Sequence, residues 1–224
     1  MNKRATFQDI APAQSLTDRA YAYLEEMIVT LQLAPGSAVS ESALSQHLGI
    51  GRTPIREALQ RLARERLVSI LPRGGVIVSE INVTSQLRLL AVRRELERLI
   101  AGSAARRATD EQRARFRELA ALFEQSAKVN DDITFMRTDR DFNVLCSSAS
   151  GNEFAAGAMS LMHSLSRRYW YIHYKQAADM PLTAKLHADI ARAIAAGDEQ
   201  RAAKASDKLL DIIEKFTRDT VSPT

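Results

Sequence analysis

Apolar side chains recur at helical spacing along most of this 224-residue chain, from about residue 83 to residue 219. No alternating strand pattern interrupts them. The repeat is broken at short polar, glycine or proline positions, namely Thr109, Asn130–Asp132, Gly151-Asn152, Met180-Pro181 and Gly197-Asp198. These breaks predict six helices, at about 83–107, 109–129, 132–149, 153–177, 182–196 and 198–219. A segment of about 140 residues can bury its own core, so we expect an all-helical bundle over residues 81–224.

Residues 13–80 follow a different plan, and residues 1–12 have the composition of a loose tail. Three helices and a hairpin are predicted there: helices at about 16–32, 41–48 and 54–66, and strands at 68–71 and 76–78 around Pro-Arg-Gly-Gly. Ser40 suits the N-cap of the second helix, and Gly49 suits its C-terminal stop. The predicted fold class is therefore mainly α, with an N-terminal winged helix-turn-helix followed by the helical bundle.

The third predicted helix begins within the stretch GIGRTPIREALQRL, residues 49–62, and combines an apolar face with a basic one. Thr53 is predicted to cap it, and Pro54 suits the first helical position. Free backbone N–H groups and the positive end of the helix dipole then lie beside Arg52 and Arg56. Such an end binds phosphate, and its arginines can reach guanine edges in a major groove. The apolar face is Ile55, Ala58, Leu59 and Leu62, and the opposite face is Thr53, Arg56, Gln60 and Arg64.

Positive charge is concentrated around this helix rather than spread over the chain, whose net charge is only +4. The segment from residue 52 to residue 73 contains six arginines but only two glutamates. Arg73, at the predicted hairpin tip, is placed to reach the DNA backbone or the minor groove. The alternative is an ordinary helix pair with a solvated arginine face. The short first helix, glycine turn, prolyl helix start and basic hairpin tip together favour DNA binding.

The composition excludes several other classes of protein. A single cysteine, Cys146, rules out an internal disulfide framework and fits a reducing cytoplasm. No apolar run is long enough to span a bilayer, and the first ten residues lack the apolar core of a signal peptide. We find no nucleophile elbow, phosphate loop or full metal set. We therefore do not expect an enzyme; the alternative is a helical hydrolase or lyase using Asp139 and His187 as acid and base.

The segment APGSAVSESALSQHLGIGRTPIREALQRLARERLVSILPRGGVIV resembles the winged helix-turn-helix of GntR-type bacterial transcription regulators. The resemblance covers about residues 30–80 and includes the whole L-S-x-x-L-G-x-x-R-T-P-x-R-E-A-L-x-R-L pattern. It implies base or phosphate contacts for Arg52, Thr53 and Arg56, and a place in the wing for Arg73 with Gly74. Ser42 departs from the pattern, because some relatives have an arginine there.

Four polar residues of the helical region occupy positions where the periodicity predicts apolar ones. Arg93 lies on the stripe of Leu89, Leu96 and Ile100, and Asp139 on that of Phe135, Phe142 and Cys146, with Asn143 one turn further. His187 shares a face with Ile190, Ala191 and Ile194. Buried polar groups need partners, so these four side chains could converge on a ligand site inside the bundle. An Arg93–Asp139 ion pair and a satisfied core histidine are the alternative, and the spacing does not decide between them.

Residues 83–219 resemble the effector-binding FCD domain of the FadR branch of GntR regulators, and six helices suit its shorter, VanR-like form. The resemblance implies that Arg93 contacts the effector. Many members bind a divalent metal with one Asp and three His, which map here to Asp139, Asn143, His187 and Leu209. Since two histidines are absent, we expect a degenerate site and no metal cofactor. The aromatic stretch SRRYWYIHYK, 166–175, is predicted to be packing, although Tyr171 or Tyr174 could reach the ligand site.

These features together predict a cytoplasmic, ligand-responsive regulator that binds a palindromic operator as a homodimer. The predicted effector is a small organic acid bound by Arg93, Asp139, Asn143 and His187, because a guanidinium binds a carboxylate in bidentate fashion. An architectural DNA-binding protein without an effector is a further alternative. It is disfavoured because polar residues on core stripes would serve no purpose in it.

Overall fold

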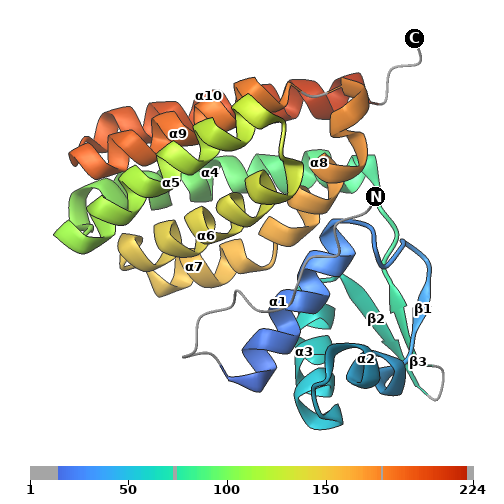
Figure 1. Cartoon of the computed structure of the whole chain (residues 1–224). Helices are drawn as coiled ribbons and strands as arrows, with labels where there is room; N and C mark the ends of the chain where they lie inside the picture. Colours follow the sequence, from blue (N-terminus) through green and yellow to red (C-terminus); the bar gives the residue numbers. More distant parts are fainter. Residues whose placement is uncertain (1–14, 73–74, 178, 221–224) are drawn as a thin grey trace. The chain divides into compact units, whose positions relative to one another are not determined.

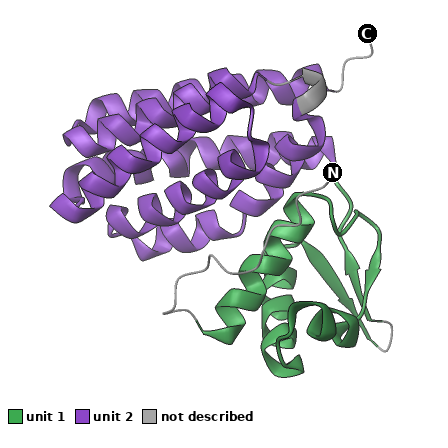
Figure 2. Ribbon diagram, viewed as in Figure 1, with its two compact units in different colours: residues 1–81 green, residues 82–224 purple. Residues whose placement is uncertain are grey.

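A computed structural model describes residues 15–72, 75–177 and 179–220 of the chain. It divides into two compact units, residues 1–81 and 82–224 (Figures 1 and 2). The division falls one residue after the boundary predicted from the sequence. The predicted tail over residues 1–12 and the predicted hairpin tip at Arg73 and Gly74 lie outside the described residues.

The first unit contains the helices α1, α2 and α3, which span Leu16–Val29, Glu41–Leu48 and Arg52–Arg64. Both predicted ends of α2 are confirmed. The Ser40 hydroxyl accepts a hydrogen bond from the backbone N–H of Ala43, and Gly49 ends the helix with a φ of 64°. This left-handed backbone favours glycine and turns the chain directly into α3.

A three-stranded antiparallel sheet completes this unit. Its strands are β1 (Ala38–Val39), β2 (Val68–Leu71) and β3 (Gly75–Val78), in the order β1-β3-β2. The predicted hairpin is confirmed, with Val68 opposite Val78 and Leu71 opposite Gly75. Strand β1 is an addition to the prediction, because two residues are too few to show an alternating pattern.

Helix α3 is fastened to α1 by a cluster of polar and aromatic side chains. The Tyr21 hydroxyl donates a hydrogen bond of 2.7 Å to Glu65, and the Arg61 guanidinium carbon lies 3.6 Å from the centre of the Tyr21 ring. Glu65 is buried, and this burial raises the pKa of its carboxyl group. The cluster holds the C-terminal end of α3 in place.

The second unit is entirely helical in its described residues (Figure 1). These residues form seven helices rather than the predicted six, because the helix predicted at 153–177 is broken at Leu161 and Met162. The break closes with a hydrogen bond from Met162 N to Met159 O, and it contains neither glycine nor proline. The helices are α4 (Val83–Arg107), α5 (Asp110–Val129), α6 (Asp132–Ser150), α7 (Glu153–Ser160), α8 (His163–Ala177), α9 (Met180–Ala196) and α10 (Glu199–Asp219). No helix in the described ranges is long and apolar enough to cross a membrane.

The core of this unit lies between α5, α6 and α9, with α4 and α10 packed along one another beside them. Four phenylalanines from α5 and α6 form its centre: Phe116, Phe123, Phe135 and Phe142. The His187 ring, from α9, is surrounded by three of them and lies 4.9 Å from Phe123. The core therefore contains a polar ring in an aromatic environment.

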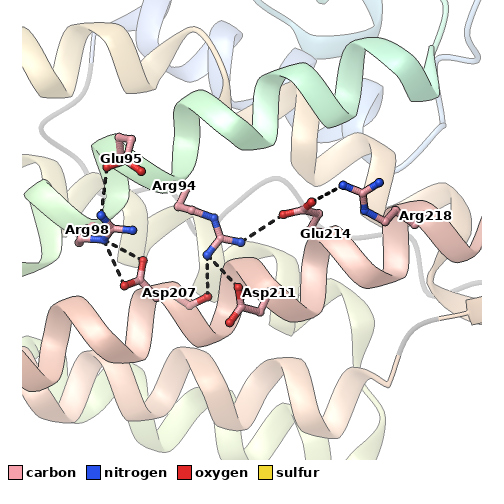
Figure 3. Close-up of polar contacts among 7 residues, drawn as sticks. All are labelled: Arg94, Glu95, Arg98, Asp207, Asp211, Glu214 and Arg218. Atoms are coloured by element: carbon pink, nitrogen blue, oxygen red, sulfur yellow. Dashed lines mark hydrogen bonds and ion pairs between the residues drawn. The ribbon is translucent and has the colours of Figure 1, made fainter.

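A row of ion pairs joins α4 to α10 (Figure 3). Arg94 contacts Asp211 at 2.8 Å and Glu214 at 3.2 Å, and Arg98 contacts Asp207 at 2.9 Å. Exposed pairs of this kind stabilise a fold by about 0–1 kcal/mol each. Their main effect is to fix the register of the two helices, both of which also line the cavity described below.

Candidate functional site

The two faces predicted for α3 are confirmed by burial. Ile55, Ala58, Leu59 and Leu62 are buried against the rest of the first unit. The residues predicted to contact DNA that the structure describes are all exposed: Arg52, Thr53, Arg56 and Gln60. Arg64 is exposed further along the helix. The apolar face thus fixes α3 and directs a row of hydrogen-bond donors to the solvent.

The start of α3 differs from the prediction, and the predicted Thr53 cap is wrong. Gly51 occupies the N-cap position, and the helix begins at Arg52, so that Thr53 lies within the first turn and Pro54 is the third helical residue. Glycine has no side chain to accept a hydrogen bond, and α3 has no side-chain cap among the described residues. The backbone N–H groups of Arg52 and Thr53 therefore remain available to an anion.

Arg56 is an exposed cation of this face. Its side chain is 60% exposed, and its Nη2 lies 3.0 Å from Glu41 Oε2 at the start of α2. Hydrogen bonding to Glu41 raises the pKa of the guanidinium. Since an exposed pair of this kind is weak, a phosphate or a guanine edge can compete with Glu41 for Arg56.

A cavity of about 30 Å³ lies inside the second unit, between α4, α6, α7, α8, α9 and α10. It holds little more than water, since a ligand pocket usually measures about 300–1,000 Å³. Three of the four predicted effector residues line it: Arg93, Asn143 and His187. The other lining residues are Glu97, Ile100, Ala101, Phe142, Cys146, Ser147, Met159, His163, Ile190, Ser206 and Leu209.

Arg93 is buried on one wall of this cavity, but it is not paired with Asp139 as the alternative interpretation suggested. Its Nε donates a hydrogen bond of 2.6 Å to Glu97 Oε1, and its Nη2 contacts the same oxygen. Its Nη1 donates to the Ser166 hydroxyl on α8. Glu97 lies at i+4 from Arg93 on the same helix, so its carboxylate reaches the guanidinium without having to bridge two helices, as Asp139 would.

Asp139 lies behind the cavity wall, where it joins α6, α8 and α9. Arg167 Nε lies 2.9 Å from its Oδ2, while His187 Nε2 and Asn143 Nδ2 each lie 3.1 Å from its Oδ1. Burial alone would raise the pKa of this carboxyl, but the hydrogen bond from His187 and the nearby cations lower it. His187 Nδ1 also lies 2.8 Å from Thr183 O, so both nitrogens of the ring face an oxygen.

His163 is a cavity residue that the sequence interpretation missed. Its Nδ1 is buried and has no hydrogen-bond partner within the described ranges. Burial, and after it the charge of Arg93, lowers the pKa of the imidazole to about 3, so the ring is neutral at pH 7. The sequence did contain a sign that His163 faces the interior. It shares the i, i+4, i+7, i+11 spacing of one helix face with Met159, Ser166 and Trp170, and these three residues are buried.

Only two of the four residues at the family's metal position, Asp139 and His187, are usual metal ligands. No group of three or more His, Cys, Asp or Glu residues suited to a metal ion occurs among the described residues. Asn143 donates its amide to Asp139, and Leu209 is buried core. Cys146 lines the cavity, but burial raises the pKa of its thiol and keeps it protonated. Two good ligands are fewer than the three or four that transition metals usually require.

The aromatic stretch on α8 serves packing, as predicted, and neither of its candidate tyrosines lines the cavity. Trp170 stacks on Tyr174 with ring centres 4.7 Å apart, and the Tyr174 hydroxyl contacts Asp132. What the interpretation of this stretch missed is Arg167, the partner of Asp139.

Comparisons with known proteins cover both units. Residues 88–211 match the family profile described as "FCD domain", and residues 16–78 match "Bacterial regulatory proteins, gntR family". The HTH-type transcriptional repressor RspR of Escherichia coli is 25% identical over 92% of this chain and 91% of its own length. A transcriptional regulator from an unstable DNA locus of Streptomyces ambofaciens is 47% identical, over 28% of this chain and 26% of its own. The structure of E. coli McbR/YncC has the same fold, with a TM-score of 0.79 and 19% identity over 93% of this chain and all of that one.

Proposed function

The chain belongs to the gntR family of bacterial transcription regulators and carries their FCD domain, and on this basis we propose that it is a homodimeric operator-binding protein controlled by a small organic acid. As a member of this family it is a DNA-binding regulator and not an enzyme. Because its target is chromosomal DNA, the proposal includes a cytoplasmic location.

The observation that carries the DNA-binding part is the uncapped, basic start of α3. Arg52, Thr53, Arg56 and Gln60 are exposed on one side of a helix whose other side is fully buried. We assign Arg56 and Arg52 to base edges or phosphates, and Thr53 and Gln60 to further polar contacts in the major groove. Arg73 and Gly74 are proposed to contact the DNA from the hairpin.

The dimer part rests on symmetry. A palindromic operator presents the same half-site twice, so a two-fold protein matches it best. Light scattering should give about twice the chain mass of 24.9 kDa. A protein that remains monomeric at micromolar concentration, both free and on DNA, would contradict this part.

The effector part rests on Arg93, a buried guanidinium on the wall of the cavity. A carboxylate can bind it in bidentate fashion. Asn143 and His187 line the same cavity, and Asp139 holds both of them in position. The cavity is too small for an organic acid as it stands, so binding must widen it. A ligand that binds the wider form better than the closed form shifts the protein between two states, and such a shift can be transmitted to the DNA-binding unit.

Two experiments test this function. Selection of tight-binding duplexes from a random pool should yield a palindromic site, bound in a strongly salt-dependent way. A thermal-shift screen of carboxylates, amines, sugars and neutral aromatics should then show stabilisation by carboxylates in the wild type but not in Arg93→Met. Stabilisation by neutral or cationic compounds alone, or an unchanged response of Arg93→Met, would refute the organic acid.

A further inference from the structure

We propose that the effector is an α-amino acid, whose carboxylate binds Arg93 and whose ammonium binds Glu97; this inference rests on the proposed function, because it refines the organic acid bound at Arg93. It follows from the hydrogen-bonding groups that the cavity offers and that the protein does not itself use.

The unused donors belong to Arg93. A guanidinium has five N–H donors, of which Nε and one N–H of Nη2 face Glu97 and one N–H of Nη1 faces Ser166. One N–H on each terminal nitrogen has no partner among the described residues. Two N–H groups on neighbouring nitrogens are what a carboxylate needs for bidentate binding, so an incoming carboxylate need not displace Glu97.

The unused acceptors belong to three other residues on the cavity wall. Glu97 contacts Arg93 through Oε1, and its Oε2 makes no hydrogen bond in the described part of the chain. Asn143 uses its amide N–H toward Asp139, which leaves its Oδ1 without a partner there. His163 Nδ1 is the third, because a neutral imidazole keeps one nitrogen as an acceptor.

This set of groups matches the polar end of an α-amino acid. An ammonium has three N–H donors and requires three acceptors, whereas a hydroxyl has only one donor. One of the acceptors is a carboxylate, and a charged hydrogen bond to a carboxylate is about twice as strong as a neutral one. His187 offers the ligand no free hydrogen-bonding nitrogen, because both of its ring nitrogens already contact protein oxygens.

The rest of the wall indicates the kind of side chain. Most of it is apolar, from α4, α6, α7, α9 and α10, namely Ile100, Phe142, Met159, Ile190 and Leu209, and its hydroxyl groups, on Ser147 and Ser206, are uncharged. We therefore infer a small apolar side chain, since a second charge would meet no charged partner at this wall.

The test compares two matched series by calorimetry on the full-length protein. Glycine, alanine, 2-aminobutyrate, valine and leucine are titrated beside glycolate, lactate and the corresponding longer 2-hydroxy acids. At least one amino acid should bind ten times or more tightly than the hydroxy acid of the same skeleton. Equal binding of the two series would overturn the amino acid but leave the carboxylate of the proposed function intact. Failure of both series to bind would also overturn the amino acid, and the carboxylate screen on the wild type and Arg93→Met would then decide the proposed function.

Variants then locate the ammonium. Glu97→Gln keeps the shape of the side chain but removes its charge, so the amino acid should lose at least tenfold in affinity while the hydroxy acid keeps or improves its own. Glu95→Gln, on an exposed side chain of the same helix, should leave the ranking unchanged. If Glu97→Gln does not fold, His163→Leu serves instead and should weaken amino acids more than hydroxy acids. If the folded variant still prefers amino acids over hydroxy acids as strongly as the wild type does, the ammonium does not bind at this acceptor.

Discussion

Gln86 Nε2 donates a hydrogen bond of 2.8 Å to the Ser166 hydroxyl, and the two side chains are both buried. The same oxygen accepts a hydrogen bond from Arg93. A single hydroxyl on α8 therefore satisfies two donors on α4, one in the first turn of that helix and one at the cavity. Both acceptor positions of this oxygen are filled.

Replacing Ser166 by alanine should lower the free energy of unfolding by about 1–3 kcal/mol, because Gln86 and Arg93 then keep buried donors without an acceptor. Denaturant unfolding of the wild type and the variant measures this loss. Ser164→Ala is a matched control, since Ser164 is also buried but its hydroxyl makes no hydrogen bond among the described residues. Equal losses in the two variants would show that Ser166 has no special role.

Arg56→Ala should weaken specific operator binding by about 1–3 kcal/mol, because it removes an exposed guanidinium near the start of α3. Arg64→Ala provides the comparison, because Arg64 is exposed at the other end of the same helix and should matter less. Fluorescence anisotropy on a labelled operator measures both. If neither variant changes the affinity, α3 is not the helix that reads DNA.

The sequence predicted most helices because each end has a local chemical cause. Ser40 and Gly49 delimit α2, and Thr109 caps α5 with a reciprocal bond from Gln112. The break at Leu161 has no such cause, since a turn built from ordinary residues leaves no mark in the periodicity. The start of α3 was misplaced because Thr53 has the chemistry of a cap, whereas the backbone uses Gly51.

The cavity could be predicted in part. A polar residue on an apolar stripe indicates burial, and this rule found Arg93 and His187, which are buried and line the cavity. It could not find their partners, because spacing along one helix does not say which residue of another helix lies opposite. The partner of Asp139 is an example: it is Arg167 on α8 and not Arg93.

Purified protein should contain no stoichiometric transition metal after dialysis, because Asp139 and His187 are the only strong ligands at the family's metal position. Adding the two missing imidazoles with Asn143→His and Leu209→His should create zinc binding. Elemental analysis of wild type, each single variant and the double variant checks this, with thermal unfolding as a control for folding. A full equivalent of metal in the wild type would contradict the prediction.

The stability of the protein should fall as the pH drops below about 6.5, and His163 should account for part of the fall. Its pKa in the folded state is lowered to about 3 by burial and by Arg93, so between pH 6.5 and 3 the unfolded chain binds a proton that the folded protein does not. The free energy of unfolding then decreases by about 1.4 kcal/mol per pH unit, or at most about 2 kcal/mol between pH 6.5 and 5. His163→Gln cannot titrate and should flatten this slope. Urea unfolding at pH 7, 6 and 5 measures it, and parallel curves for the wild type and the variant would show that His163 is not protected from protonation.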